Sequence, residues 1–121
     1  MNVKVLLPTL LALAIPAHGA ERIGIRVSPS VAFAPANLFV RAVVERRPEN
    51  RSLLIVAESA AFYRSSEVSL DGDRAPRVML LQFKSVPGGL YDVRAVVRGS
   101  AGEELASTEA RVQVVGDETE F

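Results

Sequence analysis

The chain has 121 residues, 14 basic and 14 acidic side chains, no cysteine and one histidine. This balance of charge gives no electrostatic case for a nucleic-acid partner or an anionic membrane. Without cysteine there are no disulfides and no thiolate ligands for a metal, so we expect no cofactor and a fold that is stabilised by packing.

The first 20 residues have the pattern of a secretory signal peptide. Lys4 comes early, an apolar run covers residues 5–15, and the small residues Ala17, Gly19 and Ala20 follow. A transmembrane helix needs about 20 apolar residues, so this run is too short to be an anchor. We therefore expect residues 1–20 to be removed, the product to be secreted or periplasmic, and the mature chain to have no transmembrane segment.

Removal of this segment also narrows the chemistry. It contains His18 and Lys4, so about 100 residues remain, with 13 basic and 14 acidic groups. Without histidine or cysteine, the mature chain lacks the usual general base and the thiolate nucleophile. The sequence therefore predicts that the protein is not an enzyme. A small hydrolase based on paired carboxylates, or on a serine with Lys84, is the alternative.

Alternation of apolar and polar residues between turns is typical of an all-β sandwich or barrel. The first two predicted strands, residues 23–27 and 38–45, each turn every second residue inward from Ile23 and Leu38. A charged turn at 46–50 follows them. Residues 52–58 are apolar almost throughout, which predicts a central strand.

The second half of the chain continues the pattern. Residues 62–69 are polar enough to form an edge strand, whereas the later strands are apolar enough to be interior. Strands follow at 78–83, at 90–98 and at 105–115, separated by turns at 85–89 and 99–102. The strand at 90–98 turns every second residue inward from Tyr91 to Val97. We expect one antiparallel sandwich of about seven strands over residues 21–116, followed by an acidic tail at 117–121.

Residues 80–104, LLQFKSVPGGLYDVRAVVRGSAGEE, carry a family resemblance. An apolar strand, a Pro-Gly corner, a Tyr-x-Val-x-Ala strand and a glycine hairpin occur in this order. The segment resembles the corresponding region of immunoglobulin-like and fibronectin type III-like sandwiches. The resemblance implies that Tyr91 is the tyrosine-corner residue, with its hydroxyl bonded to backbone near residues 83–86, and that Pro87 and Gly88 are structural. The cysteine pair and core tryptophan of antibody domains are missing.

Two interpretations compete for Asp71-Gly72-Asp73. With Glu67 nearby, Asp71 and Asp73 could offer carboxylates to Ca²⁺, a cation that takes 6–8 oxygen ligands. The motif lacks the longer ladder of a calcium loop, and an Asp-Gly turn explains it as well, because glycine readily adopts a positive φ. The sequence favours the turn and predicts no metal site.

Phe62-Tyr63-Arg64 is the most suggestive group for binding. Neighbouring strand residues face opposite sides, so one aromatic ring is packed and the other exposed. Exposed tyrosine beside arginine is typical of interface centres. The sequence predicts partner binding at Tyr63 and Arg64, with Arg46, Arg47 and Arg51 as a rim. The alternative is that Phe62 belongs to the core and Tyr63 is covered by a neighbouring segment.

The function expected from these features is that of an exported, non-catalytic module of immunoglobulin-like fold. Its expected role is binding to, or assembly with, another exported or cell-surface protein. Binding of a carbohydrate or another cell-surface ligand is the alternative. A composition with no tryptophan and two tyrosines weakens that alternative, because sugar sites usually stack the sugar on exposed aromatic rings.

We expect exported protein to begin at Ala20 or Glu21, because the early lysine and short apolar run direct cleavage after the small residues. Mass spectrometry of the exported protein measures this start. Secreted material that retains Met1 would contradict the prediction.

Overall fold

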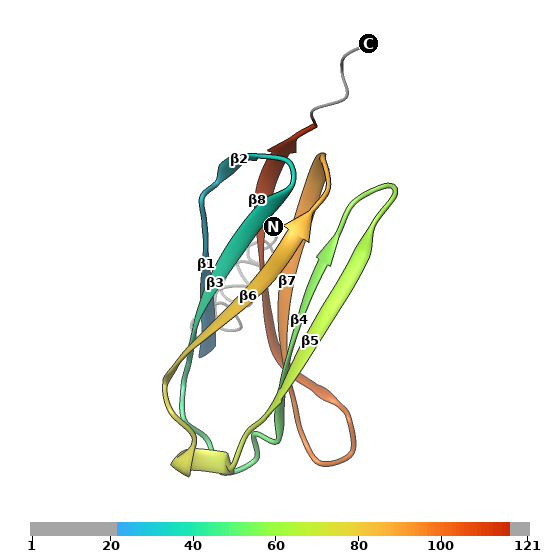
Figure 1. Cartoon of the computed structure of the whole chain (residues 1–121). Helices are drawn as coiled ribbons and strands as arrows, with labels where there is room; N and C mark the ends of the chain where they lie inside the picture. The colour runs from blue at the N-terminus through green and yellow to red at the C-terminus, as the bar shows by residue number, and fades with distance from the viewer. Residues whose placement is uncertain (1–21, 117–121) are drawn as a thin grey trace, which may run out of the picture.

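Alternating side chains along the strands produce two packed β-sheets (Figure 1). The computed structural model of the protein describes residues 22–116, so the predicted signal peptide and acidic tail lie outside the described residues. One sheet has the order β1 (Ile23–Ser28), β3 (Ala36–Val44), β6 (Val78–Val86). The other has the order β2 (Val31–Phe33), β8 (Glu104–Val115), β7 (Gly89–Arg98), β4 (Ser52–Glu58), β5 (Tyr63–Ser69). The all-β prediction is confirmed. Within residues 22–116, no helix is long and apolar enough to cross a membrane.

Strand β2 is the element that the sequence did not predict, and with it the described chain has eight strands instead of about seven. It is three residues long, lies between Pro29 and Pro35, and pairs in parallel with β8. The other strand pairings are antiparallel. Two nearby prolines make this segment resemble a turn in the sequence. It is a strand because it pairs with β8, which is distant in the chain.

The core lies between the two sheets and is built from the inward rows of the strands. Each large side chain moved from water into this layer stabilises the fold by about 1.5–3 kcal/mol. The predicted inward rows of β3 and β7 are confirmed, since their members are all buried: Leu38, Val40, Ala42 and Val44 on β3, and Tyr91, Val93, Ala95 and Val97 on β7.

Strand β4 is central, as its apolar sequence predicts. It pairs with β5 on one side and β7 on the other. Leu53, Ile55 and Ala57 face the core, and Val56 on the outer face is only 3% exposed. Strand β5 forms an edge of its sheet, which confirms the prediction drawn from its polar sequence.

The turn between β6 and β7 is fixed by Tyr91. Its ring is buried, and its hydroxyl donates a hydrogen bond to the carbonyl oxygen of Pro87 at 2.8 Å. The acceptor is thus one residue beyond the segment 83–86 that the resemblance implied. Gly88 packs against the end of β8, where an added Cβ would lie 2.6 Å from the Cα of Gly116. A side chain at position 88 would therefore push these two segments apart.

Tyr91 should be a stability residue. Tyr91→Phe loses one hydrogen bond and should cost about 1 kcal/mol of unfolding free energy. Tyr91→Ala also leaves a cavity and should cost about 3–5 kcal/mol. Urea unfolding followed by circular dichroism measures both values. An unchanged unfolding midpoint for Tyr91→Ala would contradict the burial of this ring.

Candidate functional site

The three residues Phe62, Tyr63 and Arg64 do not share one surface. Tyr63 lies on the outer face of its sheet and is 61% exposed. Arg64 points the other way, with its guanidinium carbon 5.0 Å from the centre of the Phe62 ring. The Phe62 ring meets Tyr91 edge to face, at a centroid distance of 6.0 Å. Tyr63 is thus open to a partner, and Phe62 packs against the core.

Arg64 closes one side of the sandwich. Its Nη1 donates a hydrogen bond to the carbonyl oxygen of Lys84, on strand β6 of the opposite sheet, at 2.6 Å. Both β5 and β6 are edge strands, so this contact ties the edges of the two sheets together. It also satisfies a carbonyl at a sheet edge that has no neighbouring strand. Arg64 therefore makes an internal contact and does not extend the surface of Tyr63.

The predicted rim lies at the other end of the molecule. Tyr63 pairs with Glu58, whereas Ser52, next to Arg51, pairs with Ser69. The whole length of β4 therefore separates Tyr63 from Arg51. In Figure 1 the connection between β3 and β4 lies at the lower end, and the turn between β4 and β5 lies at the upper end.

The rim arginines bind groups of their own loop or of the loop that follows η2. Arg46 Nε donates to the carbonyl oxygen of Ala75 at 3.0 Å, and Arg47 Nε lies 3.2 Å from the Glu45 carboxylate. Arg51 Nη1 donates to the carbonyl oxygens of Pro48 and Asn50, both at 2.7 Å. The structure therefore does not bring Arg46, Arg47 and Arg51 together with Tyr63.

Asp71-Gly72-Asp73 lies at the 3₁₀ turn η2 (Gly72–Arg74). Gly72 has a φ of +54°, and an added Cβ would meet the carbonyl oxygen of Pro48 at 2.9 Å. The prediction that glycine supplies a positive φ here is confirmed. Both aspartates are exposed, and residues 22–116 contain no group of three or more His, Cys, Asp or Glu side chains able to hold a metal ion.

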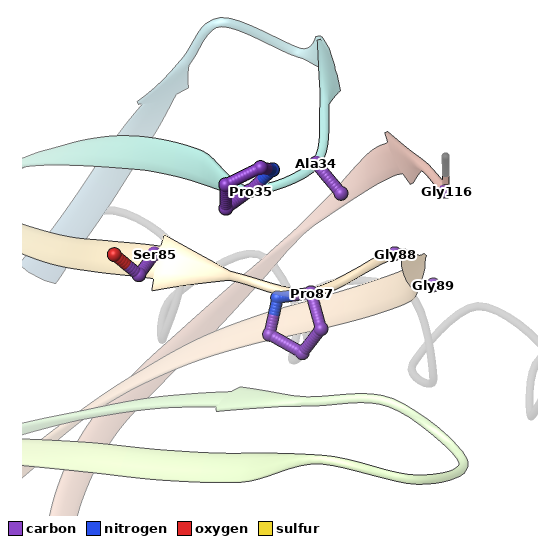
Figure 2. Close-up of a pocket in the computed structure, with 7 residues that line it drawn as sticks. All are labelled: Ala34, Pro35, Ser85, Pro87, Gly88, Gly89 and Gly116. Carbon is purple, nitrogen blue, oxygen red and sulfur yellow. The ribbon is translucent and has the colours of Figure 1, made fainter. Parts of the chain in front are cut away.

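A hollow lies beside the Pro87 corner (Figure 2). It has a volume of about 740 Å³ and opens widely to solvent. Backbone and small or ring side chains line it, and among the lining residues only Ser85 carries a polar side-chain atom: Ala34, Pro35, Ser85, Pro87, Gly88, Gly89 and Gly116. Ser85 has a φ of 56°, and its N–H donates to Asn37 Oδ1 at 3.1 Å. This hollow therefore offers shape and few specific polar contacts.

Exposed apolar side chains lie on the outer side of β3 and β6 in the three-stranded sheet. Leu80 is 75% exposed, Phe39 49% and Val78 42%, and Val43 is half-buried beside them. The register places Val43 opposite Val78 and Phe39 opposite Gln82, so Phe39 is a diagonal neighbour of Leu80. We call these four residues the apolar face. Contiguous exposed apolar side chains are uncommon on monomeric proteins and mark interaction sites.

The apolar face was not predicted, because the apolar residues at 78–83 indicate an interior strand. That prediction is wrong, since β6 is an edge strand with one open side and one exposed face. The alternation that reveals the face is present in the sequence: Met79, Leu81 and Phe83 turn inward, so Val78 and Leu80 must turn outward.

Comparisons with known proteins identify the fold only. No family model matches the chain, and no curated protein matches it in sequence. The structure is similar to superoxide reductase (neelaredoxin) from Ignicoccus hospitalis, with a TM-score of 0.62 and 14% identity over 84% of this chain and 86% of that one. It is also similar to the sulfur carrier protein SoxY from Chlorobium limicola f thiosulfatophilum, with a TM-score of 0.57 and 17% identity over 79% and 81% of the two chains. These neighbours support a β-sandwich.

The comparisons contradict the prediction that the protein is not an enzyme. Superoxide reductase is an enzyme, and its chain matches this fold over most of its length. The prediction rested on the residue types of the mature chain, and these do not determine what a fold can support. The lack of histidine and cysteine in residues 22–116 limits which reactions the chain can catalyse. It does not decide whether the chain catalyses a reaction. At 14% identity the likeness transfers no reaction to this chain.

Arg64 and Tyr63 should differ sharply in their effect on stability. Arg64→Ala removes a cation–π contact and a hydrogen bond between the sheets, and should cost about 1–2 kcal/mol. Tyr63→Ala removes an exposed ring and should change the unfolding free energy by less than about 0.5 kcal/mol. Urea unfolding of both variants tests this contrast. A larger loss for Tyr63→Ala would mean that the two side chains have exchanged faces.

Proposed function

We propose that the protein is an exported module of the immunoglobulin-like superfamily that binds another exported or cell-surface protein through its apolar face. The proposal of export rests on the early lysine, short apolar run and small residues of the first 20 positions. The proposal of binding rests on one observation, the exposed apolar side chains gathered on the outer side of β3 and β6.

Strand order and the Tyr91 contact support the superfamily assignment. The sheet β1-β3-β6 corresponds to strands A, B and E, and β8-β7-β4-β5 corresponds to G, F, C and C′. In constant-type domains the fourth strand joins the first sheet, whereas here β5 extends the sheet of β4. The hydroxyl of Tyr91 bonds to backbone four residues upstream, as in a tyrosine corner.

Energetics support a protein as the partner. Leu80 and Phe39 leave much of their surface in water, and burying each large apolar side chain against a partner contributes about 1.5–3 kcal/mol. Strand β6 adds an open edge beside these side chains, with backbone groups available to another strand. A surface that combines apolar side chains with a free strand edge suits a protein segment better than a small polar ligand.

The apolar face should be required for binding and not for folding. Phe39→Ser with Leu80→Ser should lower recovery of the partner, captured from the envelope fraction of the native host, at least about tenfold, because both anchors are removed. The melting temperature should stay close to that of the wild type, since both side chains are exposed.

Leu90→Ser is the matched control, because Leu90 is 59% exposed on the outer face of the other sheet. This variant should retain the partner. Full recovery with the Phe39 and Leu80 double variant, together with loss in Tyr63→Ala, would move the binding surface to β5 and contradict the proposal.

A further inference from the structure

Two arginines face each other beside the apolar face. Arg26 on β1 and Arg41 on β3 are direct cross-strand partners, and both are exposed. Neither takes part in any ion pair formed among residues 22–116. Like charges placed directly opposite each other destabilise a β-sheet. This pair therefore destabilises the folded chain, and no carboxylate within residues 22–116 forms an ion pair with either arginine.

The other sheet treats its charges differently. On its outer face Arg94 lies opposite Glu109 and Asp92 opposite Arg111, with Arg111 Nε 2.9 Å from the Asp92 carboxylate. Glu58 also lies opposite Asp92, but that carboxylate already has Arg111 as its counter-ion. Strands β1, β3 and β6 contain three basic residues and no acidic one. An uncompensated positive charge is thus a property of the three-stranded sheet.

A small hollow opens beside the arginine pair. It has a volume of about 190 Å³ and is lined by Gly24, Ile25, Arg26, Arg41 and Val43. Gly24 leaves room there, since a Cβ added to it would meet no atom within 4 Å. Val43 pairs with Gly24 on one side and with Val78 on the other. The hollow is therefore continuous with the apolar face.

We infer that this hollow is a carboxylate site, and that the partner presents an acidic side chain to Arg26 and Arg41 while its apolar side chains cover Leu80 and Phe39. This inference rests on the proposed function, because it names the chemistry of the partner at the same surface. Guanidinium groups bind carboxylates with two parallel hydrogen bonds, and an added negative charge removes the repulsion between the arginines.

The register sets the spacing that the partner must have. Arg26 lies opposite Arg41, and Arg41 lies opposite Leu80, so one row across the sheet holds both charges and the most exposed apolar side chain of this sheet. Neighbouring strands are about 4.8 Å apart. The partner segment therefore carries its carboxylate within about 5–10 Å of an apolar side chain on the same face, as an extended strand does when an acidic and an apolar residue are two positions apart.

A labelled seven-residue peptide with leucine and glutamate in turn at every second position, and serine between them, presents both on one face and tests the inference. A matched peptide has glutamine in place of glutamate. Fluorescence anisotropy should show tighter binding of the glutamate peptide, with an advantage that shrinks as salt is added. Arg26→Gln and Arg41→Gln should each weaken its binding about threefold to tenfold. Arg94→Gln, on the outer face of the other sheet, should leave it unchanged.

The melting temperature distinguishes a binding role of Arg41 from a structural role. Arg41→Gln should raise the melting temperature at low ionic strength, by about 1–5 °C, because it removes a like-charge pair. Arg94→Gln should lower it or leave it unchanged, because it removes an opposite-charge pair. A fall in the melting temperature of Arg41→Gln would make Arg41 a structural residue and overturn the inference.

The outcomes separate this inference from the proposed function. If Phe39→Ser with Leu80→Ser abolishes binding of both peptides, while the wild type binds glutamate and glutamine peptides equally, the apolar surface stands and the carboxylate site is overturned. If neither peptide binds wild type or variants, both ideas fail. Concentration-dependent dimers that Arg41→Gln abolishes in analytical ultracentrifugation would also overturn it, since the occupant would be a second copy of the chain.

Discussion

Each strand of this sandwich has two faces, and the period-two alternation of its side chains is the constraint on which the rest of the structure depends. The core takes one row from each strand, for example Leu38, Val40 and Ala42 on β3. The other row is then obliged to face outward, whatever its residues are. The outer face of each sheet therefore consists of the side chains that the core does not take. A binding surface on the sheets has to be formed by these side chains.

The outer faces of the two sheets differ in how their charged side chains are paired. The five-stranded sheet places opposite charges across from each other, as Asp92 and Arg111 do, beside single exposed side chains such as Tyr63 and Leu90. The three-stranded sheet leaves Phe39 and Leu80 in water and sets Arg26 against Arg41. Such a face is unfavourable in the isolated chain. Apolar and acidic groups of a second molecule that cover this face would bury the exposed side chains and neutralise the two arginines, as the proposed binding requires.

Local pattern was enough to predict the inward rows of β3 and β7, the burial of the Tyr91 ring that the family resemblance implied, and the edge position of β5. It was not enough for features that depend on distant pairing. Strand β2 exists through its parallel contact with β8, and β6 is an edge because of the strand order. The role of Arg64 depends on a carbonyl 20 residues away on the other sheet. The expectation that the protein is not an enzyme failed because residue types do not determine what a fold can support.

The central claim is that the outer side of the three-stranded sheet is the binding surface, and amide chemical-shift mapping tests it most directly. Isotope-labelled protein would be titrated with the peptide that carries glutamate and leucine on the same face of an extended strand. The account predicts that the largest shifts occur at the amides of Gly24, Arg41 and Leu80, and that β5 is unaffected. Shifts concentrated in Tyr63–Ser69, or no shifts at any peptide concentration, would contradict it.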